Sequence, residues 1–389
     1  MPGLEDSRQL VERLCARDDL ATDDPYDIWK TRGGFVVKDL FNRRRRLGLL
    51  PAAALTLFDT VVNNRARWFY AKQEYPIVRA WAALALLNLH EREPAPRLLA
   101  AVRRHLDWLR QHASPGYSGP CWGIGFRQPI SAGLIYAADL PLATMTPYPL
   151  EAFVRYHRLT GDDGVVPVIQ GIHAFFDRDL QVMEETDDHL VMSYSALPDR
   201  RVVNVQSYVM FALGLLLPYL APDRQDRARH RIGKLYRYLV RAQRPDGSWL
   251  YSPDGQSFVD CFHSCIVLKN LEKTRRDLDL PGAEAVIARG YAYLQENFRV
   301  AGTGLFKRFS VANKPSLVRY DLYDNAEMLN LAILRGDTAL IASLAPAIGK
   351  QFVRGDAIYS QVDWLGIRRN RNHLRWAVMP WLYALSQLH

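Results

Sequence analysis

The sequence predicts a single all-α domain, an (α/α)6 toroid in which six helical hairpins close into a ring. Three observations support this fold class: a helical hydrophobic pattern from about residue 51 to residue 389, a hairpin-sized internal repeat, and two kinds of helix that alternate along the chain. The composition is that of a globular protein, since 49% of the residues are hydrophobic and 23% are charged. Residues 1–50 are predicted to form a partly helical N-terminal extension, and residues 51–389 the toroid domain.

The repeat is marked by a Gly/aromatic turn between an outer and an inner helix. Its clearest copy is Gln243-Arg244-Pro245-Asp246-Gly247-Ser248-Trp249, and related turns surround Trp122, Leu190, Phe306 and Tyr359. With Trp249 as the marker of the clearest copy, successive markers are 68, 59, 57 and 53 residues apart. Intervals of this size are typical of one helical hairpin per repeat.

Two classes of helix follow from the hydrophobic pattern. Segments rich in Leu, Ala and Val on all sides are predicted to be inner helices: 77–89, 149–159, 203–220, 258–271, 322–334 and 374–388. Segments with a charged face are predicted to be outer helices: 95–111, 166–180, 226–244, 283–297 and 338–352, with 52–63 as the sixth. Closing the ring buries every apolar face and gathers the inner-helix N-termini, with their unpaired N–H groups, around one cavity.

Three features bear on where the protein acts. Residues 1–17 mix acids and bases among leucines, unlike a signal peptide, and the longest apolar stretch, 209–220, is too short to cross a bilayer. The four cysteines, at positions 15, 121, 261 and 265, are too scattered for a disulfide framework. These features predict a cytoplasmic protein with free thiols.

The chain is basic, with a formal net charge of +9 and a pI near 9.4. This charge suits an acidic partner such as nucleic acid, an anionic saccharide, a phosphate-bearing lipid or a membrane surface. The run Arg43 to Arg46 is predicted to be a solvated face, the commoner case for an isolated basic run. Peripheral membrane association through basic residues of the chain is a further expectation. A second cluster, Arg368, Arg369, Arg371 and Arg375, is interleaved with Asn, His and Trp and is predicted to line a pocket mouth.

The segments that lead into the inner helices are unusually polar and aromatic. Aromatic rings stack on the apolar face of a pyranose, while amides and charges bind its hydroxyls, so these segments predict a saccharide cavity. The candidate substrate-binding residues are Trp122, Arg127, Gln128, Tyr148, Asn204, Gln206, Trp249, Arg319, Asn325, Glu327, His373 and Trp376. The alternative for each is structural, with polar groups capping helices and aromatic rings in the core; Trp249 in particular would then only pin its hairpin.

Asp260 and His263 form the first candidate catalytic group. They are three residues apart at the start of an inner helix and therefore share a face. Asp260 would orient His263 as a general base, the two would be metal ligands, or Asp260 would cap the helix beside a structural histidine. Zinc would need a further ligand from another hairpin, so no metal and no cofactor is predicted.

The second candidate catalytic group lies at the start of the next inner helix. Tyr320, Tyr323, Asp324 and Glu327 lie at three- and four-residue spacings. Tyr323 and Asp324 would form an acid/base pair at a sugar carbon, with Arg319 neutralising a uronate. Alternatively, Asp321 and Asp324 complement the helix dipole.

Several motifs resemble known families. The run Gln243 to Trp249 resembles the Gln-Trp repeat of squalene cyclases and prenyltransferase β-subunits, which are (α/α) toroids. More closely, Asp246-Gly247-Ser248-Trp249, Phe258-Val259-Asp260-Cys261-Phe262-His263 and Cys121-Trp122-Gly123 resemble a group of prenyltransferase/squalene-cyclase-like proteins associated with bacterial exopolysaccharide and surface-glycan biosynthesis. The chain departs from that group at Cys261, where the group has Asn, and at Ile124-Gly125, where it has an aromatic-Pro pair. The resemblance implies a toroid and a role in glycan assembly.

The terpenoid relatives match less well. No Asp-x-Asp-Asp acid motif occurs, and Asp23-Asp24-Pro25-Tyr26-Asp27, a string of the magnesium-diphosphate type, lies in the extension with Pro25 interrupting any helix. The prenyltransferase zinc motif Asp-x-Cys is absent as well. Cys261 directly follows Asp260, and Phe262 stands where the thiolate should be.

These observations predict a glycan-biosynthesis enzyme that acts on an anionic saccharide or lipid-linked glycan, and not on nucleic acid. The reaction would be proton abstraction of the uronate epimerase or lyase type, or glycoside hydrolysis. His263 or Tyr323 would be the base or acid, and Arg127 and Arg319 would hold the carboxylate. The alternatives are a non-catalytic glycan- or protein-binding scaffold and a terpenoid or prenyl-lipid cyclase or transferase.

Overall fold

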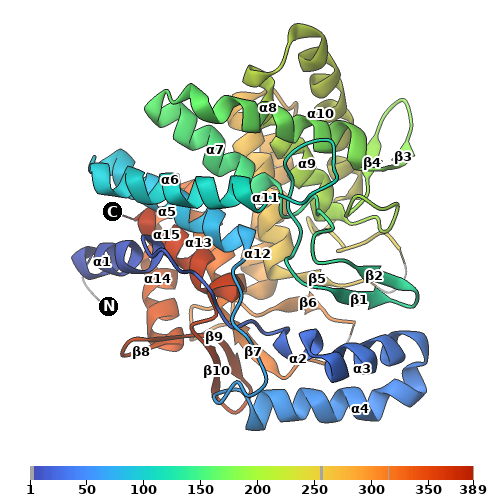
Figure 1. Cartoon of the computed structure of the whole chain (residues 1–389), viewed down its shortest axis with the longest axis vertical. Helices are drawn as coiled ribbons and strands as arrows, with labels where there is room; N and C mark the ends of the chain where they lie inside the picture. The colour runs from blue at the N-terminus through green and yellow to red at the C-terminus, as the bar shows by residue number, and fades with distance from the viewer. Residues whose placement is uncertain (1–3, 255–256, 314, 389) are drawn as a thin grey trace.

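Six inner helices form a closed ring in the computed structural model, which describes residues 4–254, 257–313 and 315–388 (Figure 1). Each inner helix packs against the next, and the sixth packs against the first, which confirms the predicted (α/α)6 toroid. In ring order they are α5 (Pro76–Arg92), α7 (Pro147–Thr160), α9 (Val203–Leu216), α11 (Cys261–Asp277), α13 (Leu322–Arg335) and α15 (Met379–Ser386).

The outer helices pack behind the inner ones. Five lie close to the predicted segments: α6 (Pro96–Gln111), α8 (Val166–Ala174), α10 (Pro222–Ala242), α12 (Ala283–Phe298) and α14 (Thr338–Phe352). The outer helices are amphipathic, whereas the inner helices are buried on all sides; residues 76–89 of α5, for example, are buried without exception.

The sixth outer helix differs from the prediction. Residues 52–62 belong to α4 (Arg45–Leu57) and the π-helical turn η1 (Phe58–Val62), and residue 63 follows η1. α4 packs against α3 (Arg32–Arg43) instead of the ring. The position is taken by α1 (Leu4–Cys15), which contacts α5 and α15 because its Val11 and Cys15 are fully buried. The predicted domain boundary at residue 50 lies inside α4 and stays a prediction.

The repeated turn has the same structural role in two hairpins. The indole N–H of Trp249 donates to the carbonyl of Leu239 at the end of α10 (2.9 Å), and that of Trp122 donates to Leu109 at the end of α6 (3.0 Å). A Cβ atom at Gly290 of α12 would lie 2.7 Å from the Trp249 ring, so glycine is required for the helix to approach it. The turn tryptophans therefore hold each outer helix to its turn.

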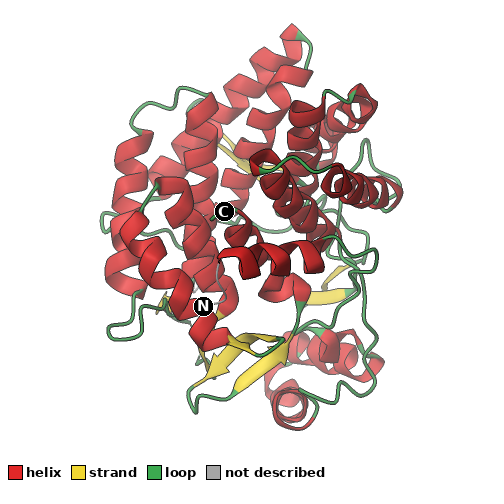
Figure 2. Ribbon diagram, turned by 90° about the vertical axis from the view of Figure 1, so that its left-hand side faces the viewer, coloured by secondary structure: helices red, strands yellow, loops and turns green. Residues whose placement is uncertain are grey.

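Short antiparallel strands, absent from the helical prediction, connect the hairpins in the described residues. β1 (Gln128–Ser131) pairs with β2 (Leu134–Tyr136), β3 (Val182–Glu185) with β4 (Leu190–Met192), and β5 (Val259–Asp260) with β6 (Phe309–Val311). In the remaining sheet β9 (Ala357–Asp363) pairs with β7 (Val318–Asp321), β8 (Val353–Arg354) and β10 (Arg368–Arg371). The β7–β9–β10 sheet lies at the same end of the molecule as α3 and α4 (Figure 1, Figure 2).

The N-terminal segment crosses this end of the ring. It contains the short helix α2 (Asp27–Lys30), and further helical turns occur at η2 (Asp163–Val165), η3 (Phe175–Asp179), η4 (Leu217–Tyr219) and η5 (Leu374–Val378). The Thr22 hydroxyl accepts a hydrogen bond from the backbone N–H of Leu374 (2.9 Å), so the segment contacts the approach to α15. Within the described ranges, no helix has the length and apolar character needed to cross a membrane.

Candidate active site

A cavity of about 600 Å³ opens at the N-terminal ends of the inner helices. The second residue of every helical segment that enters the ring lines it: Ile77, Tyr148, Asn204, Phe262 and Tyr323 of α5, α7, α9, α11 and α13, and Arg375 of η5, which leads into α15. The other aromatic side chains of the lining are Tyr26, Phe126, Tyr194, Tyr208, Tyr251, Phe258, Phe309 and Trp376. The cavity lies where the toroid prediction placed it.

Asp260 and His263 form a hydrogen-bonded pair in this cavity. The Asp260 carboxylate, 3% exposed, accepts from Nδ1 of His263 at 2.7 Å. It makes no capping bond to the α11 backbone, so the capping alternative does not describe it. The strand pair β5–β6 sets Asp260 beside Phe309, and the His263 ring packs against Phe262 at 3.8 Å between centroids. With Nδ1 occupied, Nε2 is the nitrogen left for a substrate.

Three arginines line the cavity, and two of them have a carboxylate partner. Arg308 pairs with Asp321 (3.0 Å), and Arg375 binds Asp24 through two nitrogens. Arg200 has no carboxylate partner among the described residues, its Nε is buried without a hydrogen bond, and its guanidinium lies 4.2 Å from the Tyr194 ring centroid. Arg200 therefore supplies a positive charge that no carboxylate of the described chain neutralises.

Tyr323 and Trp376 form a stacked pair on the cavity wall, with centroids 4.7 Å apart and planes at 15°. The Trp376 indole N–H donates to the buried Asp321 carboxylate (3.2 Å), which fixes the indole. Burial, with a smaller contribution from the charge of Glu327, raises the pKa of Tyr323 well above its ordinary value. The Tyr323 phenol therefore stays protonated and is suited to donate a hydrogen bond.

Seven of the predicted site residues line this cavity: Gln128, Tyr148, Asn204, Asp260, His263, Tyr323 and Trp376. Asn204 is 4% exposed, and its side-chain oxygen has no hydrogen-bond partner among the described residues. Tyr148 shares a 2.5 Å hydrogen bond with the hydroxyl of Tyr208. These groups are available to bind a polar ligand.

Four predicted binding residues do not line this cavity and make contacts within the repeat. Trp122 and Trp249 pin their outer helices. Gln206, fourth in α9, binds the N–H and carbonyl of Met192, and Asn325, fourth in α13, binds the same two groups of Phe306. Each amide also donates to the backbone carbonyl of the residue that precedes its helix. In α9 and α13 the fourth position thus clamps the preceding turn, and neither side chain lines the cavity.

Asp324 and Glu327 are fully buried behind the cavity wall. An Asp324 oxygen accepts from the backbone N–H of Phe262 (3.1 Å), so this carboxyl group caps α11 from the neighbouring helix. Burial raises the pKa of Asp324 well above its ordinary value. Glu327 is in an ion pair with Lys269 of α11.

Arg127, Arg319 and His373 lie elsewhere. Arg127 is exposed and packs on the ring of Phe35, while Arg319 packs on Tyr320 and Trp364. His373 lines a second cavity of about 560 Å³, together with basic residues that include the predicted pocket-mouth residues Arg368 and Arg371. Burial lowers the pKa of His373 to about 3.

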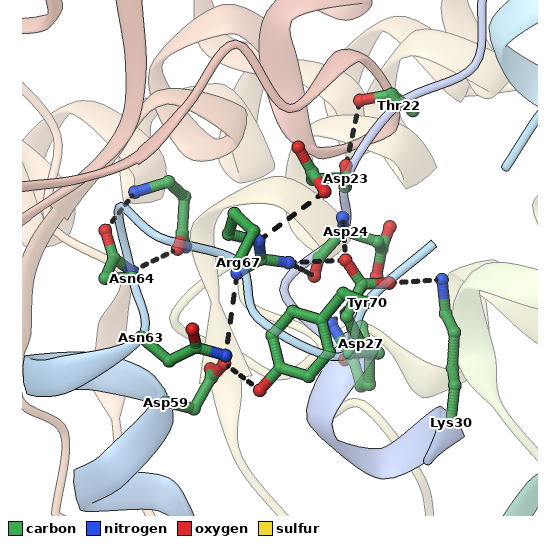
Figure 3. Close-up of polar contacts among 12 residues, drawn as sticks. Thr22, Asp23, Asp24, Asp27, Lys30, Asp59, Asn63, Asn64, Arg67 and Tyr70 are labelled. Atoms are coloured by element: carbon green, nitrogen blue, oxygen red, sulfur yellow. Dashed lines mark hydrogen bonds and ion pairs between the residues drawn. The ribbon is translucent and has the colours of Figure 1, made fainter. Parts of the chain in front are cut away.

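The acidic string that resembles a magnesium-diphosphate motif is already neutralised. Asp24 pairs with Arg375, and Asp27 pairs with Lys30 and Arg67. Figure 3 shows Arg67 among these acids, with its guanidinium also 3.6 Å from Asp23. Carboxylates held in this way are not free to bind a metal, and no group of three or more metal-ligating side chains occurs in the described ranges.

The sequence reasoning missed Arg200 and Arg308 as site residues. Both lie in irregular segments between a turn and the next inner helix, where the helical pattern gives no orientation. Arg308 is positioned by the β5–β6 pair, since its carbonyl accepts from Cys261 N–H (2.9 Å). For Arg200, the available signal was a basic residue shortly before the inner helix that begins at Val203; Arg308 has no such signal.

Comparison with known proteins supports the fold. No protein-family model matches the sequence, and no curated protein matches it either. Among solved structures, a sugar epimerase from a ruminal bacterium is similar at a TM-score of 0.62 and 11% identity, covering 80% of this chain and 87% of its own. A GH76 α-mannanase of Bacteroides thetaiotaomicron is similar at a TM-score of 0.59 and 11% identity, covering 90% of this chain and 96% of its own. A polysaccharide lyase is similar at a TM-score of 0.56 and 10% identity, covering 92% of this chain and 97% of its own. At these identities the similarity establishes the toroid fold alone. The reaction has to be inferred from the residues of the site.

Proposed function

We propose that this protein is a carbohydrate-active enzyme that moves a proton on an anionic saccharide, as a uronate epimerase or lyase does. The observation that carries the proposal is the Asp260–His263 pair in the cavity, which fixes the imidazole and presents Nε2. The structurally similar proteins include a sugar epimerase and a polysaccharide lyase, which is consistent with this class of chemistry.

In the proposed reaction, Nε2 of His263 takes the proton from the carbon next to the uronate carboxylate, and the electron pair moves into the carboxylate. Arg200 stabilises the charge that develops on the carboxylate oxygens. Asp260 holds the imidazole and stabilises its protonated form. In an epimerase a second group, for which the protonated phenol of Tyr323 is the candidate, delivers a proton to the opposite face of that carbon. In a lyase the electron pair forms a double bond and expels the group at the next carbon, which takes its proton from the same phenol.

The carboxylates favour proton abstraction over hydrolysis. Most glycoside hydrolases use two carboxyl groups that flank the scissile bond. Among the described residues that line the cavity, Asp260 is the only carboxylate, and it is bound to His263. Hydrolysis would therefore lack its second acid.

Arg200, which has no carboxylate partner among the described residues, supports an anionic substrate, and the charged groups of the lining separate this proposal from a terpenoid cyclase. A cavity for a hydrocarbon chain needs few charges, whereas this one contains Arg200, Arg308 and Arg375. The resemblance to glycan-biosynthesis proteins favours a substrate from that process, in soluble or lipid-linked form. The four cysteines are buried free thiols, which is consistent with a protein that acts in the cytoplasm.

Hydrogen exchange at the substrate carbon tests the proposal. The purified protein is incubated in deuterium oxide with uronate oligosaccharides, neutral oligosaccharides and polyprenyl diphosphates, and deuterium incorporation is followed by NMR alongside thermal shifts. Exchange with a uronate that His263→Asn abolishes and His112→Asn keeps would support proton abstraction; His112 is exposed and stacks on Trp108. A thermal shift with neither deuterium exchange nor an unsaturated sugar product in the NMR spectrum would favour the binding scaffold. A shift with polyprenyl diphosphates alone would favour the terpenoid alternative.

A further inference from the structure

The outer side of α4 is exposed and apolar. Leu47, Leu50 and Leu57 are 60%, 78% and 63% exposed, and Val61 of η1 is 59% exposed. These four follow helical spacing, and no charged residue stands between Arg46 and Asp59. The packed side of α4 contacts α3 through Gly48, where a Cβ atom would lie 2.3 Å from the Phe41 backbone. A surface helix normally carries polar side chains outward, so the outer side of α4 needs a partner.

A second group of exposed apolar side chains lies at the tip of the β9–β10 hairpin. Trp364 is 64% exposed and Leu365 is 84% exposed, and the neighbouring Leu317 is 68% exposed. The hairpin is joined to the segment after α4, since Arg369 donates to the carbonyl of Thr60 and Asn64 donates to Asn370. We call the two groups together the apolar rim: Leu47, Leu50, Leu57, Val61, Leu317, Trp364 and Leu365.

Two hydrogen bonds connect the elements that carry the apolar rim to the lining of the active-site cavity. Ser316, which lines the cavity, accepts a hydrogen bond from the Trp364 indole at 3.0 Å. On the other side, Asn42 of α3 donates to the carbonyl of Pro129 (3.2 Å), next to the cavity residue Gln128. Both groups lie at the end of the molecule that carries α3, α4 and the β9–β10 hairpin (Figure 1, Figure 2).

The charge beside the rim identifies its partner. Arg43 to Arg46, at the turn between α3 and α4, are all exposed. Arg43 pairs with Asp39, and Arg44, Arg45 and Arg46 have no carboxylate partner in the described chain. Apolar side chains beside unpaired cations are typical of helices that lie in the surface of an anionic bilayer.

We propose that the apolar rim and Arg44 to Arg46 dock this protein on an anionic phospholipid bilayer, with the cavity mouth at the lipid surface. The evidence for the docking surface is only the exposure of the apolar rim and the charge of Arg44 to Arg46. The consequence of docking for the substrate rests on the proposed function: a saccharide that reaches the cavity from the bilayer is lipid-linked, so the head group enters the cavity while its lipid stays in the membrane.

Vesicle flotation tests the docking. Vesicles of phosphatidylcholine with an equal part of phosphatidylglycerol are expected to carry the wild-type protein, and pure phosphatidylcholine vesicles much less of it. Leu50→Glu/Leu57→Glu is expected to abolish flotation, and replacing Arg44 to Arg46 by Gln to weaken binding by about five-fold per arginine. Val182→Glu on β3, where Val182 is 50% exposed, is the matched control and is expected to float like the wild type.

Two outcomes would overturn the docking proposal. One is that the wild-type protein does not float with the anionic vesicles, or that Leu50→Glu/Leu57→Glu floats equally well. The other is that light scattering finds a dimer that this double variant dissociates, since the rim would then bind a second copy. Circular dichroism checks that the double variant is folded.

The docking and the proposed function fail separately. If docking is right and the reaction is wrong, His263→Asn and the wild type float alike and neither exchanges deuterium into a uronate. If the reaction is right and docking is wrong, Leu50→Glu/Leu57→Glu retains full exchange with soluble uronate oligosaccharides while the wild type fails to float.

Discussion

Asp24 and Arg375 form a buried ion pair between parts of the chain that are 351 residues apart, with Nη2 of Arg375 donating to Asp24 at 2.8 Å. The Asp24 side chain is fully buried and that of Arg375 is 10% exposed. The pair fixes the N-terminal segment to η5, and it places the Arg375 guanidinium on the cavity wall beside Trp376.

Removing one partner of this pair is expected to destabilise the protein strongly. Asp24→Asn leaves the Arg375 charge buried and uncompensated, so the free energy of unfolding should fall by about 3–5 kcal/mol. Asp24→Leu/Arg375→Met should recover most of that loss, since it removes both charges. Urea unfolding of the three proteins measures this; a single variant as stable as the wild type would contradict the ion pair.

The same pair predicts a dependence on acid. Burial alone would raise the pKa of Asp24, but the charge and hydrogen bonds of Arg375 outweigh burial and hold it below its ordinary value. The folded-state pKa is depressed, so the stabilisation is present above the unfolded pKa of about 3.9 and is lost as the pH falls through the folded value. The stability difference between wild type and Asp24→Asn should therefore be constant from pH 7 to about pH 5 and shrink only below about pH 4.

Because His105 is buried in its neutral form, the protein is expected to lose stability in a different pH range. Nε2 of His105 lies 2.7 Å from the carbonyl of Cys15, and burial lowers the pKa of His105 to about 4. The unfolded chain binds this proton near pH 6.5 and the folded chain does not, so stability falls as the pH drops from about 6.5 toward 4, by about 3 kcal/mol. His105→Gln should be less stable at pH 7 and lose less between pH 7 and pH 4.5, as followed by the unfolding midpoint.

Arg200 is expected to select the anionic substrate. Arg200→Gln removes the cavity cation that has no carboxylate partner, and it should raise KM for a uronate saccharide about ten- to a hundred-fold. KM for a neutral analogue, where one is turned over, should stay unchanged. Arg127→Gln, outside the cavity, is the control. An equal effect of Arg200→Gln on both substrates would show that Arg200 only supports the wall.

Asn204 and Gln206 are two residues apart and are expected to differ in role. Asn204→Ala should weaken substrate binding with little change in the unfolding midpoint. Gln206→Met loses three hydrogen bonds to backbone groups and should destabilise the protein by about 2–3 kcal/mol without changing KM of the folded fraction. Thermal melts and saturation kinetics on both variants separate the two outcomes; reversed results would move Gln206 into the site.

The sequence was sufficient for the ring but not for the identity of its sixth outer helix. Inner helices such as α5 are buried all round and outer helices such as α10 on one stripe, and both patterns are readable from residue types. Residues 52–63 have an apolar helical pattern as well, and nothing local distinguishes an apolar face that meets the ring from one that faces outward. Whether an apolar face meets the ring or faces outward is determined by tertiary contacts.

Only part of the site was predicted correctly from the sequence, and the reason is geometrical. Successive residues of a helix point about 100° apart, so an uncertainty of one or two residues in where a helix begins turns a cavity residue into a buried one. Asn204 and Tyr323, second in their helices, line the cavity, while Gln206 and Asn325, fourth, clamp the turns. Arg200 and Arg308 lie outside the helices, where no periodicity constrains the side chain.

The ring of second-position side chains has a consequence for how substrate preference can change. Each of the six, from Ile77 to Arg375, comes from a separate hairpin, whereas the clamps that hold α9 and α13 in register stand two positions later. The residues that face the substrate cavity and the residues that hold the fold therefore occupy different positions of the same repeat. A new preference can be assembled by exchanging the second residue of one hairpin at a time, with the clamps unchanged; Arg375 is the exception, because it also forms the buried ion pair with Asp24.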